Sequence, residues 1–160
     1  MTFDDAKRQI NWEYDYYIRC LLNQVPESFM EFRINENLPC VHKILSHMIA
    51  SADDFFIFHL FFGYFLKQKD ISLDFTRKKP VQILETLDKI RELEIAGLEK
   101  FTDTNFYDII LKEEQHWISL GIAINHVSEH KSYHMGQLFM MADLAGINIE
   151  GHKLPYGIEP

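Results

Sequence analysis

The chain has 160 residues, of which 47% are hydrophobic and 25% charged, a composition typical of one globular domain and not of a disordered or fibrous chain. Its formal net charge is −8. Nucleic-acid binding depends on clustered Lys and Arg, so we expect no direct contact with DNA or RNA. Eight histidines and 13 phenylalanines stand out. We interpret residues 1–160 as a single domain.

The two cysteines and the apolar runs predict the cellular compartment of the protein. Cys20 and Cys40 belong to no C-x-x-C motif, which is typical of reduced cytoplasmic thiols. The first residues, MTFDDAKRQI, are too polar for a signal peptide. The most apolar run, residues 55–66, is too short to span a bilayer. We therefore expect a cytoplasmic protein without membrane contact.

The first predicted helix covers about residues 3–24, where apolar residues recur at spacings of three, four and seven. Thr2 and Asp5 form a predicted capping box at its start, because the side chain of each can bind the backbone of the other. Pro26 ends the helix.

The second predicted helix begins near Pro39 and runs to about residue 67. Its predicted inward stripe is Ile44, Met48, Ser51, Phe55, Phe58, Phe62 and Phe65. Phenylalanines nevertheless surround more than one face of the helix: Phe55, Phe56, Phe58, Phe61, Phe62 and Phe65. A helix that is apolar all round needs cover on every side, so this excess predicts a homodimer contact.

Two further helices are predicted, at about residues 80–101 and 118–145, with Gly146 as the left-handed C-terminal cap of the last one. Residues 102–114 are ambiguous, and part of them is typical of an extended segment. The sequence therefore predicts an all-α fold, a four-helix bundle. Longer connections at 26–38 and 68–79 favour at least one crossover over strict up-and-down connectivity.

Three histidines repeat every four residues on the last predicted helix: His126, His130 and His134. Side chains four apart on an α-helix lie about 40° from one another, so the three imidazoles share one face, which is also the apolar face. Buried imidazole nitrogens need partners. Ordinary hydrogen bonds would satisfy one such histidine, whereas three at this spacing favour a metal site.

His126 and His134 are roughly 12 Å apart along the helix axis, so one adjacent pair would bind a single ion while the remaining histidine carries protons or supports a ligand. A further ligand has to come from another helix. Helix two offers His42, His47 and His59. His47 borders the inward stripe and is our choice, whereas His42 is expected to be solvated at the helix start.

Other metal and nucleophile motifs are missing from the sequence. A di-iron bundle needs two Glu-x-x-His motifs, and the chain has one, from Glu113 to His116. The sequence also contains no His-Glu-x-x-His, no glycine-rich phosphate loop and no G-x-S-x-G. Because these motifs are absent, the three histidines on the last predicted helix are the main candidates for a chemical site.

The segment 126–137, H-V-x-x-H-x-x-Y-H-x-G-Q, resembles the last helix of the DinB/YfiT-like superfamily. The segment Ile-Leu-Ser-His-Met-Ile at 44–49 is similar to the second-helix motif of that family, and Asn-Trp-Glu-Tyr at 11–14 fits its aromatic first helix. The resemblance covers nearly the whole chain. It implies a four-helix bundle that holds a divalent metal through three histidines.

Carried over by position, the resemblance implies that the metal ligands are His47, His130 and His134. His126 then occupies the place of a frequent upstream histidine of the family. We interpret His126 as a proton carrier and Gln137, one turn beyond His134, as a group that orients a ligand, both near the reaction. For both residues a structural hydrogen bond within the bundle is the alternative. Zinc or nickel is the favoured ion and iron is an alternative, because imidazole suits all three.

Three neutral nitrogen ligands leave an open coordination position, which is typical of a catalytic metal site. Because several members of the resembled superfamily use thiols, the leading hypothesis is a transferase that joins a small-molecule substrate to a low-molecular-weight thiol. A metal-dependent hydrolase is the alternative enzyme. A non-catalytic metal-binding stress-response protein is the alternative outside the enzyme class.

Overall fold

The computed structural model describes residues 1–50, 74–99, 101–113 and 116–151. Its first helical stretch combines α1 (Phe3–Trp12), a π-helical segment η1 (Glu13–Ile18) and α2 (Arg19–Leu22), one directly after the other. The predicted capping box is confirmed, with Asp5 N donating to Thr2 Oγ1 at 3.2 Å and Thr2 N donating to Asp5 Oδ2 at 3.0 Å. Hydrogen bonds from the Thr2 backbone and hydroxyl lower the pKa of Asp5 to about 2.

A short 3₁₀ helix, η2 (Glu27–Glu31), precedes α3 (Val41–Ala50), which is the described part of the second predicted helix. Ile44 and Met48 are buried, as the predicted inward stripe requires. The rest of that stripe and the phenylalanine cluster fall within residues 51–73, outside the described residues. The homodimer therefore stays a prediction. The third predicted helix is α5 (Pro80–Glu99).

A β-hairpin lies before the last helix. Strands β1 (Ile110–Glu113) and β2 (His116–Ser119) pair antiparallel, with Ile110 opposite Ser119. The last helix, α6 (Leu120–Leu144), therefore begins two residues later than predicted, because residues 118 and 119 belong to the ladder and the Ser119 hydroxyl caps the helix by accepting from Ile122 N. Gly146 has φ +73°, which confirms the predicted left-handed cap.

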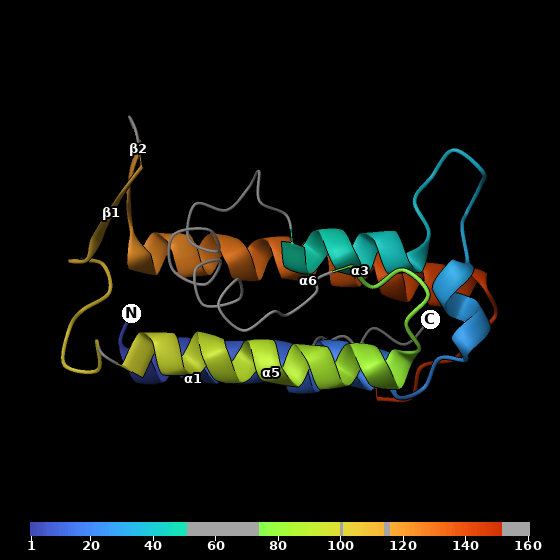
Figure 1. Ribbon diagram of the computed structural model, residues 1–160, viewed down its shortest axis with the longest axis horizontal. Coiled ribbons are helices and arrows are strands. Elements are labelled where there is room, and N and C mark those ends of the chain that lie inside the picture. Colours follow the sequence, from blue (N-terminus) through green and yellow to red (C-terminus); the bar gives the residue numbers. More distant parts are fainter. Residues whose placement is uncertain (51–73, 100, 114–115, 152–160) are drawn as a thin grey trace.

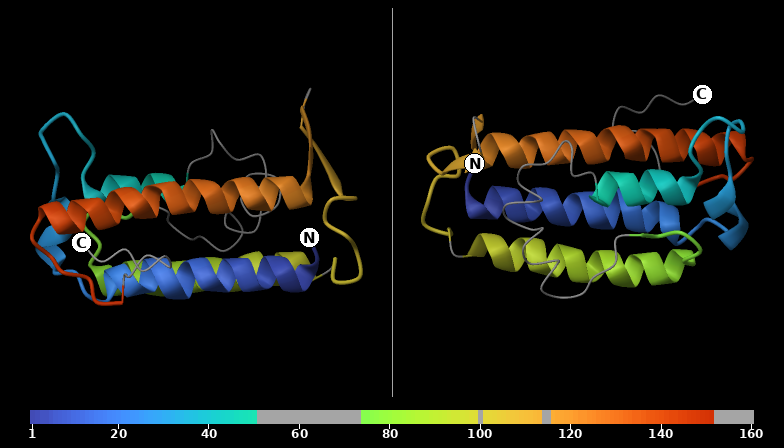
Figure 2. Two further views of the ribbon diagram at one scale, coloured as in Figure 1. Left: turned by 180° about the vertical axis from the view of Figure 1, so that it is seen from behind. Right: turned by 45° about the horizontal axis from the view of Figure 1, so that its top comes forward.

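The described helices form two layers, α3 beside α6 and α1 beside α5 (Figure 1). The view from behind shows the same two layers (Figure 2). Helices α1 and α6 run in one direction and α3 and α5 in the other, so the described helices do not simply alternate along the chain (Figure 1). Completely buried side chains fill the space between the layers: Ile18, Leu45, Ile83, Leu87, Ile90 and Leu138.

The predicted all-α class is confirmed in that the described structure is mostly helical, with the small hairpin at one end. None of the helices in the described ranges is long and apolar enough to cross a membrane.

Candidate metal centre

Three histidines meet where α3 packs against α6. The ring centroids of His130 and His134 are 4.5 Å apart, and the ring of His47, from α3, lies 5.3 and 4.8 Å from them. One nitrogen from each ring forms a group whose members all lie within 4.8 Å of one another. The His130 and His134 Nε2 atoms are 3.0 Å apart. The structure thus brings together the three residues that the family resemblance implied as ligands.

The three rings span the distance from core to surface. His134 is buried, with 8% of its surface exposed, whereas His130 is half-buried and His47 is exposed. The inner end of the cluster is therefore held by core packing, while the side formed by His47 is open to small molecules. Such an arrangement suits an ion that keeps an exchangeable position.

Gln137 determines which nitrogen of His134 carries the proton. An amide oxygen only accepts hydrogen bonds, so His134 Nδ1 donates to Gln137 Oε1, at 2.7 Å. The Gln137 amide is fixed in turn, because its Nε2 donates to the Tyr133 hydroxyl at 3.0 Å. In the neutral ring the lone pair of His134 is then on Nε2, the atom that faces His130. This is the tautomer that a metal ligand needs.

The donor set fits a divalent cation. Two Nε2 atoms at 3.0 Å need either a proton or a cation between them, and the nearby nitrogen of His47 completes a set of three neutral imidazoles. Imidazole is a common ligand for zinc, nickel, iron and copper. The proton on His134 Nδ1 is already engaged by Gln137, so a metal at Nε2 breaks no hydrogen bond on that side.

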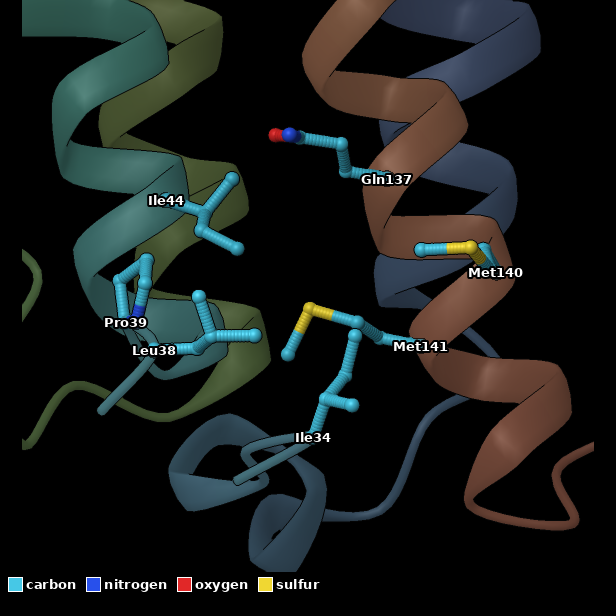
Figure 3. Close-up of a pocket in the computed structure, with 7 residues that line it drawn as sticks. All are labelled: Ile34, Leu38, Pro39, Ile44, Gln137, Met140 and Met141. Carbon is cyan, nitrogen blue, oxygen red and sulfur yellow. The ribbon is translucent and has the colours of Figure 1, made fainter. Parts of the chain in front are cut away.

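An apolar cavity of about 90 Å³ lies between α3 and α6 (Figure 3). Ile44 is one turn before His47 on α3, and Gln137 is one turn after His134 on α6. The other lining residues are Ile34, Leu38, Pro39, Met140 and Met141. Gln137 reaches from α6 into the gap toward α3 (Figure 3), so one side chain contacts both the cavity and the imidazole cluster.

Two of the remaining histidine predictions are wrong in part. His126 was expected on the buried face but is exposed, and it contributes no atom to the group of three ligand nitrogens. His42 was expected to be solvated but is only 4% exposed. Its Nε2 lies 2.9 Å from the Lys78 carbonyl oxygen, because the segment before α5 covers the start of α3. His59 falls outside the described residues.

Sequence reasoning missed a second polar cluster, between η1, α5 and α6. Lys131 Nζ lies 3.5 Å from Glu13 Oε2 and 3.4 Å from Glu94 Oε1, and all three side chains are buried. Burial raises the pKa of Glu94. Burial alone would lower the pKa of Lys131, but the facing carboxylates outweigh it and raise that pKa. The signal was available, because Ile124, Lys131 and Leu138 recur every seven residues on one buried face.

Comparison with known proteins identifies the relatives of this chain. The profile of the DinB family matches residues 8–156. A crystal structure of a DinB-like protein from Bacillus cereus ATCC 10987 superposes with a TM-score of 0.66 over 89% of this chain and 92% of that one, at 13% sequence identity. At this identity the superposition shows a shared fold. No curated protein matches the chain.

Proposed function

The chain belongs to the DinB family, and on this premise we propose that it is a metal-dependent enzyme that transfers a low-molecular-weight thiol to a small-molecule substrate. His47, His130 and His134 are the proposed ligands of the divalent ion. The observation that carries the proposal is the convergence of these three imidazoles, whose ligand atoms lie within 4.8 Å of one another. The proposed frame is a four-helix bundle with a longer crossover connection.

An ion held by three neutral ligands acts as a Lewis acid that keeps its full charge, and it lowers the pKa of a thiol or a water molecule that binds it. Zinc or nickel suits the donor set best, and iron is a further candidate. Gln137 holds His134 in the required tautomer, and thus positions a ligand without touching the ion. His126, exposed on α6, is the proposed proton carrier.

The apolar cavity supports a substrate with a nonpolar part. A volume of about 90 Å³ lined by aliphatic and methionine side chains accommodates a short hydrocarbon group. The flexible Met140 and Met141 adapt to its shape. With that group in the cavity, the polar end of the substrate lies near the imidazoles, since the lining residues Ile44 and Gln137 are each one helical turn from a ligand histidine.

Elemental analysis of full-length protein, purified without an affinity tag, tests the metal centre. We expect His47→Ala, His130→Ala and His134→Ala each to lose one equivalent of divalent metal relative to the unaltered chain. His126→Ala is the matched control, because it removes an imidazole from the same helix without touching the cluster, and its metal content should not change. Unchanged metal content in all three ligand variants would show that the assignment is wrong.

A second measurement separates the transferase from its alternatives. A chain with both Cys20 and Cys40 replaced by serine is loaded with cobalt, and a low-molecular-weight thiol is added. We expect a new near-ultraviolet charge-transfer band, absent in His134→Ala, because the added thiol is the only sulfur donor besides methionine. No band, together with hydrolysis of simple esters, would support a hydrolase instead. No band and no hydrolysis would support a non-catalytic metal-binding protein.

A further inference from the structure

A second group of ligand-type side chains lies at the other end of α3. Glu31 is the last residue of η2, Cys40 precedes α3, and His42 is in its first turn. One atom from each forms a set within 4.8 Å. The backbone joins these elements directly, because Val41 N donates to Phe32 O at 3.3 Å. The three side chains are therefore held on a fixed frame.

His42 contributes a buried ring nitrogen that still requires a partner. Its side chain is 5% exposed, and its Nε2 donates to the Lys78 carbonyl oxygen at 2.9 Å. The neutral ring then has its lone pair on Nδ1, which forms no hydrogen bond in the part of the chain that the structure describes. A carboxylate oxygen of Glu31 lies 2.9 Å from this atom. Two lone pairs at that distance need a cation or a proton between them.

The backbone carbonyl on the far side of His42 is the usual support of a metal-binding imidazole. Such a partner fixes the tautomer and the ring plane and makes the other nitrogen a better ligand. The proton alternative is an ion pair between a charged His42 and Glu31, 62% of whose side chain is exposed. That pair would give no role to the buried thiol of Cys40, which belongs to the same set.

We propose that Glu31, Cys40 and His42 form a second metal site, specific for a borderline-soft divalent ion such as zinc. A thiolate, an imidazole and a carboxylate are all ligands that zinc accepts, and the two anionic ligands neutralise its charge. Glu31 gives the ion a route from solvent, since the other two ligands are buried. This site does not depend on the imidazole cluster.

The ion at this site fastens the loop at residues 32–39, which connects η2 with α3. Glu31 and Cys40 lie on either side of that loop, and three of its residues, Ile34, Leu38 and Pro39, line the apolar cavity (Figure 3). An ion bound between the two ends of the loop restricts its freedom and so shapes one wall of the cavity. The role of this loop as a wall of the substrate cavity rests on the proposed function. The second metal site itself does not.

Cobalt titration of metal-free, full-length protein tests the proposal, because thiolate bound to cobalt gives an intense near-ultraviolet band that imidazole and carboxylate do not give. We expect the band to appear without any added thiol by the time two equivalents of cobalt, one for each proposed site, have been added. The band should persist in the His130→Ala/His134→Ala double variant, which separates this site from the imidazole cluster. Absence of the band from the unaltered chain would overturn the proposal without recourse to any variant.

Substitutions then identify which cysteine supplies the thiolate that binds cobalt. Cys40→Ser should lose the band, whereas the matched control Cys20→Ser should keep it, since Cys20 lies elsewhere, with its Sγ 3.5 Å from the Glu150 carbonyl oxygen. Glu31→Gln, at an exposed position, should keep the band and bind cobalt about 10- to 100-fold more weakly. A band that survives Cys40→Ser, or one that vanishes with the His130 and His134 side chains, would contradict the assignment. Circular dichroism verifies that each variant is folded.

Discussion

Helix α6 contributes to two polar clusters that differ in burial and in the charges of their members. His130 and His134 face α3, whereas Lys131 faces η1 and α5. In the second cluster, Lys131 meets two carboxylates, and the Tyr14 ring centroid lies 4.9 Å from its Nζ. In the first, the Nε2 atoms of His130 and His134 lie 3.0 Å apart.

The two clusters also differ in burial, because all three side chains of the charged cluster are buried, whereas the imidazole cluster extends to the exposed His47. The charged cluster finds its counterions within the fold, and Ser128 Oγ donates one more hydrogen bond to Glu13. Its expected contribution is to stability, because loss of one partner would leave an uncompensated buried charge. The imidazole cluster brings three ligand-type nitrogens within 4.8 Å of one another, and its proposed contribution is to metal binding. His130 and Lys131, which are neighbours on α6, thus belong to separate clusters.

We expect the largest effect from removal of the Lys131 ammonium, which tests the charged cluster. In Lys131→Met, Glu13 and Glu94 are left buried without their countercharge, and we expect the free energy of unfolding to fall by about 3–5 kcal/mol. Urea denaturation measures this change. Lys7→Met, at an exposed position on α1, is the control and should leave stability nearly unchanged. A loss no larger than that of the control would mean that the charged cluster does not stabilise the fold.

Gln137→Met tests the imidazole cluster, because it removes the acceptor of His134 Nδ1 and keeps a side chain of similar length. We expect metal affinity to fall about 10- to 100-fold with little change in stability. Competition with a chelator measures the affinity. Tyr133→Phe removes only the hydroxyl that accepts from Gln137 Nε2, and its effect should be smaller. Equal affinities in Gln137→Met and the unaltered chain would exclude a positioning role for Gln137.

The smallest expected effect is a loss of stability at alkaline pH, and it depends on the charged cluster alone. Burial, followed by the charges of Glu94 and Glu13, raises the pKa of Tyr14 well above its ordinary value of 10.0. Above pH 10 the unfolded chain therefore releases the Tyr14 proton while the folded chain retains it, so stability is present below this pH and lost as the pH rises. The contribution is at most about 1.4 kcal/mol per pH unit.

Denaturation of Tyr14→Phe at a series of alkaline pH values tests this linkage. The variant should lose stability less steeply above pH 10 than the unaltered chain does. The exposed Tyr16→Phe is the control, since it removes a tyrosine from the same segment and should keep the steep slope. Identical slopes in all three proteins would contradict the assigned shift. Metal affinity should be the same in the two variants, because neither residue contacts the imidazole cluster.

Local signals in the sequence were sufficient for much of the fold. The Thr2 cap and the Gly146 cap depend only on neighbouring residues, and both appear as predicted. The fourfold spacing on α6 also predicted that His130 and His134 would lie together. The position of His47 beside the apolar stripe was sufficient to choose it over His42, and the family resemblance agreed with that choice. These features require no knowledge of how distant segments pack.

Features that depend on distant segments were not predictable. The burial of His42 comes from the Lys78 carbonyl, which lies 36 residues further along the chain. The exposure of His126 shows that the apolar face of α6 does not run straight along the whole helix. The start of α6 depends on the pairing of Ile110 with Ser119. In each case a contact distant in sequence, or the mutual rotation of helices, decides the position of the side chain.

The π-helical segment η1 gives the first helix a tolerance to changes in chain length. Each residue added to or removed from an α-helix rotates everything beyond it by about 100°, which would ordinarily turn α2 away from the core. A π-turn already contains one residue more than α-helical geometry needs. Deletion of one residue within 13–18 would therefore leave α1 and α2 packed. Relatives one residue shorter here are expected to keep the scaffold.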